Sequence, residues 1–327
     1  MNISVVIPNY NGVQLFPLTL PTLFVALEHS GLEYEVIIVD DCSTDGSERF
    51  IKDNFPQITI LSNIHNSGFS KTINKGIFAA KNDLILLLNS DVKLNSDYLN
   101  NQLHYFQMPD TFGVMGKIIG WEDEEVQDAA KYPKFEGFKL KTSYNYIPDG
   151  SVDRNAYSMY LSGANALVNR EKLVQLGGFN ELYSPFYMED VDLSIRAWRV
   201  GWKCYFEPLS ICRHRTSTSI ASKEKKRFVK ITYNRNKMYF HAIHQNGIFL
   251  WAWYVQTLFE LLIRLFTLQF DYLDSVKAFL ETPDKISLSK EQISELSKTT
   301  GVGLSLQDVA RIIKNSIEKQ NVVLFKR

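Results

Sequence analysis

Tyr34–Asp41, which reads YEVIIVDD, is the stretch that decides the fold. Its centre is apolar and largely β-branched, and it ends in two carboxylates. Continuous apolar strands of this kind are typical of a parallel sheet that helices cover on both faces. Two other runs have the same character, Ser4–Pro8 before it and Leu84–Leu88 (LILLL) after it. The predicted buried strands of one sheet are therefore Ser4–Pro8, Tyr34–Asp40 and Leu84–Leu88.

Helical patterns alternate with these strands, which predicts the α/β class with a mostly parallel central sheet. The first part of the chain predicts helices and one more strand, in the order Leu15–Ser30, Ser47–Asn54, the strand Ile58–Leu61, and Lys71–Ala80. Farther on, the pattern predicts helices over Arg170–Leu176 and Val191–Val200 and a strand over Lys203–Phe206. Residues 112–148 show no clear period, and we expect loops and an acidic patch there.

Composition excludes several classes of protein. The chain has 327 residues, which favours about two domains. Lys and Arg number 36, and so do Asp and Glu, so there is no basic surplus and we expect no nucleic-acid partner. The three cysteines form no C-x-x-C pair and the first residues resemble a strand rather than a signal peptide. We therefore expect a cytoplasmic protein without a disulfide framework.

Four polar clusters stand where strands end or helices begin: Pro8–Gly12, Asp40–Gly46, Asn89–Asp91 and Glu189–Asp192. Open α/β sheets bind ligands at the carboxyl ends of their strands. A single acid there can simply cap a helix. Several acids at successive strand ends indicate a binding site, because a buried carboxylate needs a partner.

The ligand of this site is predicted from what the motifs contain and lack. The sequence has neither G-x-G-x-x-G after its first strand nor G-x-x-x-x-G-K-[ST] anywhere. Carboxylates repel a diphosphate unless a divalent cation lies between them. Mn²⁺ or Mg²⁺ binds carboxylates and substrate phosphates together. The sequence therefore predicts a nucleotide diphosphate bridged by one of these ions.

The ordered motifs resemble those of family 2 glycosyltransferases. They are SVVIPNYNG, VDDCSTDGS, NSGFSKTINKGI, LLLNSDV, GGFNE and MEDVDLSIR, and they extend over about Ile3 to His214. The resemblance implies an inverting enzyme with the GT-A nucleotide-diphospho-sugar-binding fold and a C-terminal helical region. The tail, with Arg235-Asn236, resembles the rhamnosyltransferase-like branch that builds bacterial surface polysaccharides.

Position within these motifs implies the roles of individual residues. The nucleotide-sugar-binding set is Pro8, Tyr10, Asp40, Asp41, Lys71, Asn74, Asn89 and Ser90. Asp41 corresponds to the acid that accepts the N–H of the base. Ile73 stands where many members have an arginine, and Lys71 is a candidate for the missing positive charge.

The metal ligands implied are Asp91 and His214. Asn89-Ser90-Asp91 occupies the D-x-D place of the family, where only Asp91 is a carboxylate here. Some members place a histidine near the metal after a strand, as His214 is placed. A structural role for this lone histidine is the alternative.

The resemblance identifies Asp190 as the catalytic base. An acceptor hydroxyl is a poor nucleophile until a positioned carboxylate takes its proton. Glu189 is expected to orient Asp190 or to contact the acceptor, and Asp192 to cap or brace the turn. Trp198 is an acceptor-binding candidate, with core packing as the alternative.

The predicted reaction moves a sugar from a UDP- or dTDP-sugar to a hydroxyl of a glycan or lipid-linked glycan. One alternative is a catalytically silent nucleotide-sugar-binding or scaffold protein, which the incomplete D-x-D motif favours. A nucleotidyltransferase is the other alternative, although the glycine-rich basic loop expected near the first strand is missing.

The C-terminal part has a different composition. We expect a catalytic domain over residues 1–220 and a helical region over residues 221–327. A basic run between Lys223 and Lys237 precedes Ile248–Phe270, in which Gln256, Glu260 and Arg264 share one helical face. This pattern favours an amphipathic helix over a membrane span. The tail is expected to lie on the inner face of the cell membrane, or to pack on its own domain or in a homodimer.

Overall fold

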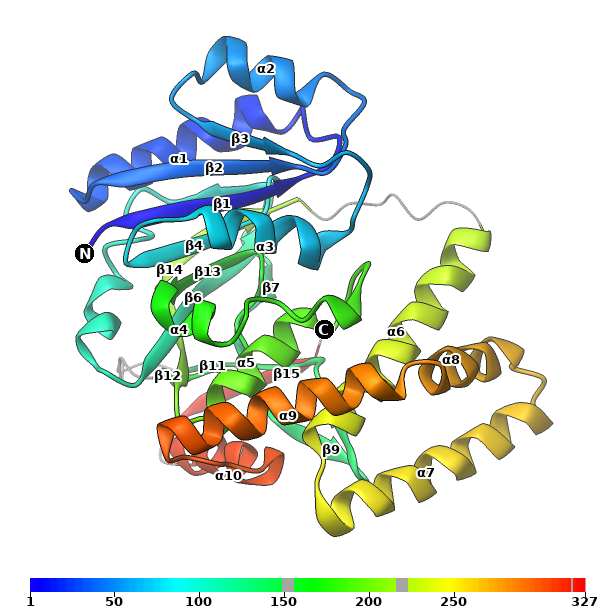
Figure 1. Ribbon diagram of the computed structural model, residues 1–327. Helices are drawn as coiled ribbons and strands as arrows, with labels where there is room; N and C mark the ends of the chain where they lie inside the picture. Colours follow the sequence, from blue (N-terminus) through cyan, green and yellow to red (C-terminus); the bar gives the residue numbers. More distant parts are fainter. Residues whose placement is uncertain (149–155, 216–222, 319, 327) are drawn as a thin grey trace.

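The computed structural model describes residues 1–148, 156–215, 223–318 and 320–326, and its centre is a mixed β-sheet (Figure 1). The strands follow one another along the sheet in the order β12 (Ala156–Tyr157), β14 (Lys203–His214), β6 (Thr111–Gly120), β13 (Asn165–Asn169), β4 (Leu84–Leu88), β1 (Ile3–Asn9), β2 (Tyr34–Asp40) and β3 (Thr59–Ser62). Strands β4, β1, β2 and β3 are mutually parallel. The predicted α/β class with a largely parallel sheet and C-terminal helices is confirmed.

The first half of the chain follows the predicted alternation closely. Its elements are β1 (Ile3–Asn9), α1 (Phe16–Ser30), β2 (Tyr34–Asp40), α2 (Ser47–Asn54), β3 (Thr59–Ser62), α3 (Phe69–Ala79) and β4 (Leu84–Leu88). Gly31 ends α1 in the left-handed region at φ 68°, a conformation that glycine adopts without a Cβ penalty. In-register pairing of β1 with β2 places Asn9 opposite Asp40, so both polar clusters reach the same edge of the sheet.

The second half of the sheet contains the antiparallel pairs. Its elements are β5 (Val92–Leu94), η1 (Leu103–Gln107), β6 (Thr111–Gly120), β7 (Val126–Asp128), β12 (Ala156–Tyr157), β13 (Asn165–Asn169) and β14 (Lys203–His214). β13 lies antiparallel between β4 and β6, whereas β14 is parallel to β6. β14 is much longer than the predicted strand, because its pairing with β6 resumes after an irregularity and continues to His214.

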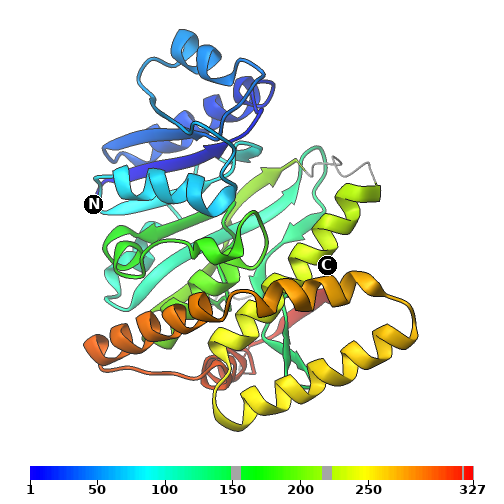
Figure 2. The same ribbon diagram turned by 45° about the vertical axis from the view of Figure 1, so that its right-hand side comes forward.

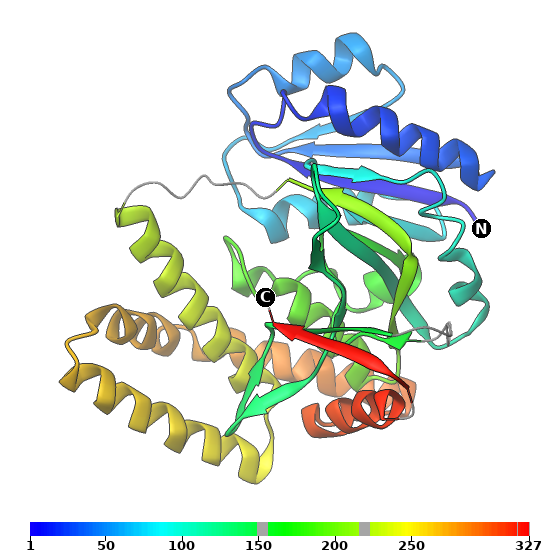
Figure 3. The same cartoon turned by 180° about the vertical axis from the view of Figure 1, so that it is seen from behind.

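The expectation of loops over residues 112–148 is wrong. Besides β6 and β7, this segment holds β8 (Ala130–Lys131), β9 (Lys134–Glu136), β10 (Lys139–Lys141) and β11 (Tyr144–Pro148). β9 and β10 form a hairpin, and β11 pairs with both β8 and the C-terminal strand β15 (Val322–Lys326). The short strands carry no recognisable period, and β11 is completed by a strand from the far end of the chain (Figure 3).

Helices flank the sheet and extend beyond it on one side (Figure 2). The later ones are α4 (Arg170–Gln175), η2 (Glu181–Tyr183), α5 (Glu189–Arg199), α6 (Lys223–His244), α7 (Gly247–Phe266), α8 (Phe270–Leu280), α9 (Pro283–Thr300) and α10 (Leu306–Ile317). Figure 1 shows α6, α7 and α8 as an arm at the side of the sheet.

Alternation along the strands divides the core between two faces of the sheet. Val5 and Ile38 lie in the same cluster as the buried side of α1. Val6 and Ile37 lie in the cluster of the opposite face, which also contains Phe240 of α6. The C-terminal helices therefore share one apolar core with this face of the sheet. The predicted boundary between residues 220 and 221 falls outside the described residues.

Candidate active site

A cleft of about 840 Å³ opens at the carboxyl ends of β1, β2 and β4. The predicted residues that line it are Pro8, Tyr10, Asp41, Asn89, Ser90 and Asp91. The remaining lining residues are Asn9, Asn66, Gly68, Phe69, Thr72, Pro185, Phe186, Lys225 and Phe228. The structure thus brings six of the predicted residues together, as expected from the parallel arrangement of these strands.

Asp41 accepts hydrogen bonds from the loop between β3 and α3, which forms one wall of this cleft. Its Oδ1 accepts hydrogen bonds of 2.8 Å from Nδ2 of Asn63 and from the backbone N–H of Ser67. Its Oδ2 accepts one bond of 3.0 Å from the N–H of Gly68. A carboxylate oxygen has about two acceptor sites, so Oδ2 keeps one for a ligand.

Asp40 does not line the cleft, which corrects its predicted contact with the nucleotide. Its Oδ1 accepts from Nδ2 of Asn9 at 2.7 Å and from the hydroxyl of Ser43 at 2.6 Å, and its Oδ2 accepts from the Ser43 N–H at 2.8 Å. The side chain is buried and saturated with internal donors. Asp40 holds the loop after β2 instead of touching a ligand.

Asp91 lines the cleft, and His214 lies directly beside it without belonging to the lining. Nε2 of His214 lies 3.4 Å from Oδ1 of Asp91, because β5 and β14 pair antiparallel with His214 opposite Val92. Nδ1 of His214 and Oδ1 of Asn89 are buried without a hydrogen-bond partner. Among the described residues, no cluster of three or more His, Cys, Asp or Glu could hold a metal ion. Any cation here would need ligands from substrate or water.

Two predicted nucleotide contacts lie elsewhere. Asn74 is buried, and its amide accepts from the N–H of Phe179 and donates to the carbonyl of Phe179, both at 2.8 Å. Lys71 and Asn74 line a second cavity of about 740 Å³, not the cleft that contains Asp91. Asn74 therefore fixes the turn after α4, and the structure does not bring the charge of Lys71 to the cleft.

Asp190 and Glu189 begin α5 behind one wall of the cleft. A Cβ on Gly163 would lie 3.3 Å from Cζ of Phe69, which lines the cleft, and 3.9 Å from Cβ of Asp190. Asp190 itself borders a small internal cavity that it shares with Gly163. Asp190 is therefore not among the residues that line the large cleft, although it lies near Gly163 and Phe69.

Burial raises the pKa of both carboxyl groups. The pKa of Asp190 rises to about 6, although the Val191 N–H and the nearby Lys131 oppose the shift. The pKa of Glu189 rises to about 8, through burial first and the charge of Asp190 second. Oε2 of Glu189 is buried without a hydrogen-bond partner. Groups perturbed in this way are typical of functional sites.

Trp198 belongs to the core, which corrects its predicted contact with the acceptor. Its side chain is 1% exposed, and its Nε1–H donates to the carbonyl of Ser158 at 3.1 Å. Its ring packs edge-on against Tyr157. The indole is therefore satisfied internally and cannot stack on a sugar.

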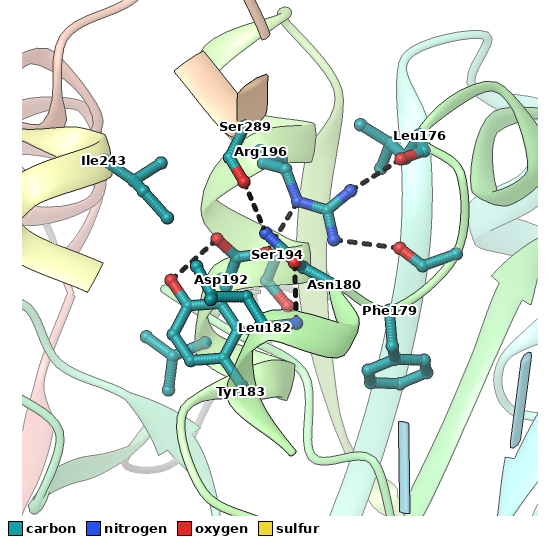
Figure 4. Close-up of polar contacts among 12 residues, drawn as sticks. Leu176, Phe179, Asn180, Leu182, Tyr183, Asp192, Ser194, Arg196, Ile243 and Ser289 are labelled. Carbon is teal, nitrogen blue, oxygen red and sulfur yellow. Dashed lines mark hydrogen bonds and ion pairs between the residues drawn. The ribbon is translucent and has the colours of Figure 1, made fainter. Parts of the chain in front are cut away.

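Asp192 is the centre of a buried network that fixes α5 (Figure 4). Its Oδ2 accepts from Nε of Arg196 at 2.7 Å, and its Oδ1 accepts from Tyr183 at 3.1 Å and from His244 at 2.9 Å. Burial alone would raise the pKa of Asp192, but Arg196 and His244 hold it below its ordinary value. Burial lowers the pKa of His244 to about 4, so a neutral ring donates to Asp192.

Arg196 extends this network to the turn after α4. In Figure 4 its guanidinium points toward Leu176, and the structure gives bonds of 2.7 Å to that carbonyl and 2.9 Å to the carbonyl of Gly178. Asn180 on the same loop donates to the hydroxyl of Ser289 on α9 at 2.9 Å. The predicted bracing role of Asp192 agrees with these contacts.

Asn236 of α6 holds the loop that leads to Glu189 and Asp190. Its Nδ2 lies 2.6, 2.8 and 3.0 Å from the carbonyls of Tyr183, Phe186 and Tyr187. Arg235 donates to the carbonyl of Ser184 at 2.7 Å. Phe186 also lines the cleft, so the C-terminal region positions part of the site.

Sequence patterns did not identify several residues of the cleft. Asn66 and Phe228 lie on a loop and on α6, and no strand end marks them. Arg235-Asn236 was noted only through the resemblance of the tail to the rhamnosyltransferase-like branch, and the loop that these residues hold is known only from the structure.

The sheet order and the cleft at its edge define the GT-A class of nucleotide-sugar-binding fold. The solved structure of GalNAc-T7 with UDP, GalNAc and Mn²⁺ matches with a TM-score of 0.59 at 15% identity, over 98% of this chain and 57% of that one. A likeness at this identity shows the fold alone.

Residues 4–177, more than half of the chain, match the family Glycosyl transferase family 2. The chain belongs to this family. It is 25% identical over 209 residues to the N-acetylglucosaminyl-diphospho-decaprenol L-rhamnosyltransferase of Mycobacterium tuberculosis, covering 56% of this chain and 67% of that protein. It is 22% identical over 236 residues to chondroitin synthase of Escherichia coli, covering 62% of this chain and 33% of the synthase. The chain thus spans only a third of the length of the synthase.

Proposed function

We propose that this chain is an inverting glycosyltransferase that acts in the synthesis of a surface polysaccharide. The donor is a UDP- or dTDP-sugar, and the acceptor is a hydroxyl of a glycan or lipid-linked glycan. The observation that carries the proposal is the contact of His214 with Asp91, a residue that lines the cleft at the carboxyl ends of the parallel strands.

The residues at this end of the cleft fit Mn²⁺. A carboxylate and an imidazole lie within 3.4 Å of each other, and Nδ1 of His214 and Oδ1 of Asn89 are buried without partners. Manganese accepts imidazole as well as oxygen ligands, whereas Mg²⁺ prefers oxygen alone. Asp91 and His214 would hold the ion. When bound, it would neutralise charge on the departing nucleoside diphosphate.

The walls of the cleft bind and orient the donor. Tyr10 is 56% exposed and offers its ring to the base, beside Pro8. Oδ2 of Asp41 keeps an acceptor site that can take an N–H of the base. Because Asp40 and Asp41 are held by several internal donors, these walls are fixed before the donor arrives.

Asp190 takes the proton of the acceptor hydroxyl. Its raised pKa makes it a stronger base than an ordinary aspartate. Attack on the anomeric carbon from the side opposite the nucleotide then inverts the configuration. The acceptor approaches from the α5 side, beside Gly163, where a Cβ would lie 3.3 Å from Cζ of Phe69.

The acceptor class rests on the relatives. The mycobacterial protein is named as a transferase to a diphospho-decaprenol carrier. A lipid-linked glycan is therefore the first acceptor to test here, with L-rhamnose among the donor sugars.

The test is a donor screen by thermal shift with and without Mn²⁺, followed by a transfer assay with the donors that bind. A ligand that binds only the native state raises the melting temperature. We expect Mn²⁺-dependent stabilisation by one nucleotide sugar and transfer to a polyprenyl-linked glycan. Donor binding without transfer or donor hydrolysis over many acceptors would favour the silent binding protein instead, as the incomplete D-x-D motif allows.

A further inference from the structure

Helix α7 presents a continuous apolar face to solvent. Trp251 is 70% exposed and Phe266 is 87% exposed. The large apolar side chains exposed along the helix are Ile248, Phe249, Trp251, Tyr254, Val255, Leu258, Phe259, Leu262, Ile263 and Phe266. Leu268 and Phe270 continue the same surface beyond the helix. An apolar patch of this extent on a soluble protein marks an interaction surface.

The polar side of α7 faces the protein. Oε1 of Gln256 accepts from the N–H of Phe138 at 2.7 Å, and Glu260 pairs with Lys139 at 2.5 Å. Trp253, on the same side, is buried and stacks on His241. The amphipathic helix is therefore oriented opposite to the usual arrangement, in which the apolar face is buried.

These contacts distinguish between two roles for α7, a helix that lies on a membrane surface and a helix that spans the membrane. α7 is long and apolar enough to cross a membrane by length and composition, yet only 6% of its apolar window is buried in the protein. A span would carry Gln256, Glu260 and Arg264 into hydrocarbon and break the bonds to the β9–β10 hairpin. The polar side stays bonded when the helix lies in the plane of a membrane surface.

A cationic cluster lies behind the apolar face. Lys139 forms an ion pair of 2.5 Å with Glu260 of α7, and Lys141 forms one of 2.7 Å with Glu136 of β9. The charges of four further cations act on these two carboxylates: Lys237 and Arg264 on Glu260, and Lys134 and Lys326 on Glu136. Burial lowers the pKa of Lys237, and the charge of Lys141 lowers it further. The cluster therefore has a positive excess that an anion would relieve.

We propose that the apolar face of α7 inserts into the surface of an anionic lipid bilayer and that the cationic cluster lies at the level of the headgroups. A helix is about 10–12 Å thick with its side chains. A helix in the plane of the interface inserts by about 5–10 Å. Charges on the side away from the lipid then reach the headgroup layer, where each adds to the attraction.

Charge complementarity selects a bilayer over a second copy of the chain. A partner copy that docks through the same face brings the same positive cluster, and the two clusters repel at close range. An anionic bilayer provides both hydrocarbon for the apolar face and negative charge for the lysines. The inference does not depend on the proposed transfer reaction.

The test is vesicle sedimentation of the full chain, with vesicles of phosphatidylcholine alone and with added phosphatidylglycerol. We expect binding to the anionic vesicles that falls at least tenfold in the triple variant W251D/L258D/L262D. The matched control is Leu18→Asp on α1, where a leucine is 45% exposed compared with 56% for Leu258. The control is expected to bind like the unmodified chain.

A second pair of variants tests the charges. Lys134→Gln with Lys326→Gln should weaken binding to anionic vesicles, whereas Lys81→Gln with Lys298→Gln, two exposed lysines elsewhere, should not. Circular dichroism checks that each variant is folded. The proposal is overturned if the unmodified chain does not bind anionic vesicles, or if the triple variant binds them unchanged. It is also overturned if the apolar substitutions only convert a dimer to a monomer by light scattering.

Discussion

Nε2 of His214 lies 3.4 Å from Oδ1 of Asp91, although one residue follows β4 and the other ends β14. The antiparallel pairing of β5 with β14 brings them together. A carboxylate and an imidazole thus meet at Asn89-Ser90-Asp91, and we propose that they hold a metal ion together where this motif has only a single carboxylate.

The first prediction concerns this pair. Asp91→Asn and His214→Ala should each reduce the Mn²⁺-dependent thermal stabilisation by a nucleoside diphosphate, because each removes one ligand. Stabilisation measured without the ion should stay unchanged, since Tyr10 and Asp41 are untouched. Equal Mn²⁺ dependence in His214→Ala and the unmodified chain would assign a structural role to the histidine.

The second prediction concerns Asp190 as the base. Asp190→Asn should lower the transfer rate by about 10²–10⁴-fold while donor binding is retained. Burial raises the pKa of Asp190 to about 6, so the rate of the unmodified enzyme should fall as the pH drops below this value. The measurement is kcat/KM against pH at saturating metal. Full transfer by the variant would refute the assignment.

The third prediction concerns stability and Glu189. Its pKa is raised to about 8, so between pH 4.5 and 8 the folded state holds a proton that the unfolded state releases. Stability must then fall as the pH rises through this window. At pH 8 the Glu189→Gln variant should therefore have a higher melting temperature than the unmodified chain. At pH 5 the difference between the two melting temperatures should be smaller. An equal difference at both values would contradict this protonation of Glu189.

The fourth prediction concerns Asn236. Asn236→Ala leaves carbonyls of residues 183–187 without their donor, which costs about 1–3 kcal/mol of stability. Because the loop leads to Asp190, kcat should fall more than the affinity for the donor. The matched control is Asn234→Ala, a half-buried residue of the same helix. Denaturant unfolding and steady-state kinetics give the two readouts, and identical behaviour of both variants would remove the positioning role.

The parallel half of the fold could be predicted because its signals are local. Tyr34–Asp40 and Leu84–Leu88 are strands with the predicted bounds, since each is a continuous apolar run between helices. The polar residues that follow such runs must share an edge of the sheet, which placed Asp41 and Asp91 in one cleft.

Other roles could not be predicted, because they depend on which side of an element meets the rest of the protein. Asp40 and Asp41 are neighbours in sequence, but successive side chains of an extended chain point to opposite sides. The carboxylate of Asp40 therefore bonds to the loop after β2, and that of Asp41 lines the cleft. Asn74 and Trp198 carry polar atoms suited to a ligand, but partners distant in sequence, Phe179 and Ser158, occupy them.

The sequence by itself determined the alternation of strands and helices, the family and the edge of the sheet at which the site lies, because these follow from the period of apolar residues and from motifs in fixed order. Only the tertiary structure decided that His214 reaches Asp91, that Asn236 holds the loop before Asp190, and that α7 presents its apolar side outward. Each of these depends on pairing between distant segments, and the amphipathic pattern of α7 is the same whichever face meets the protein.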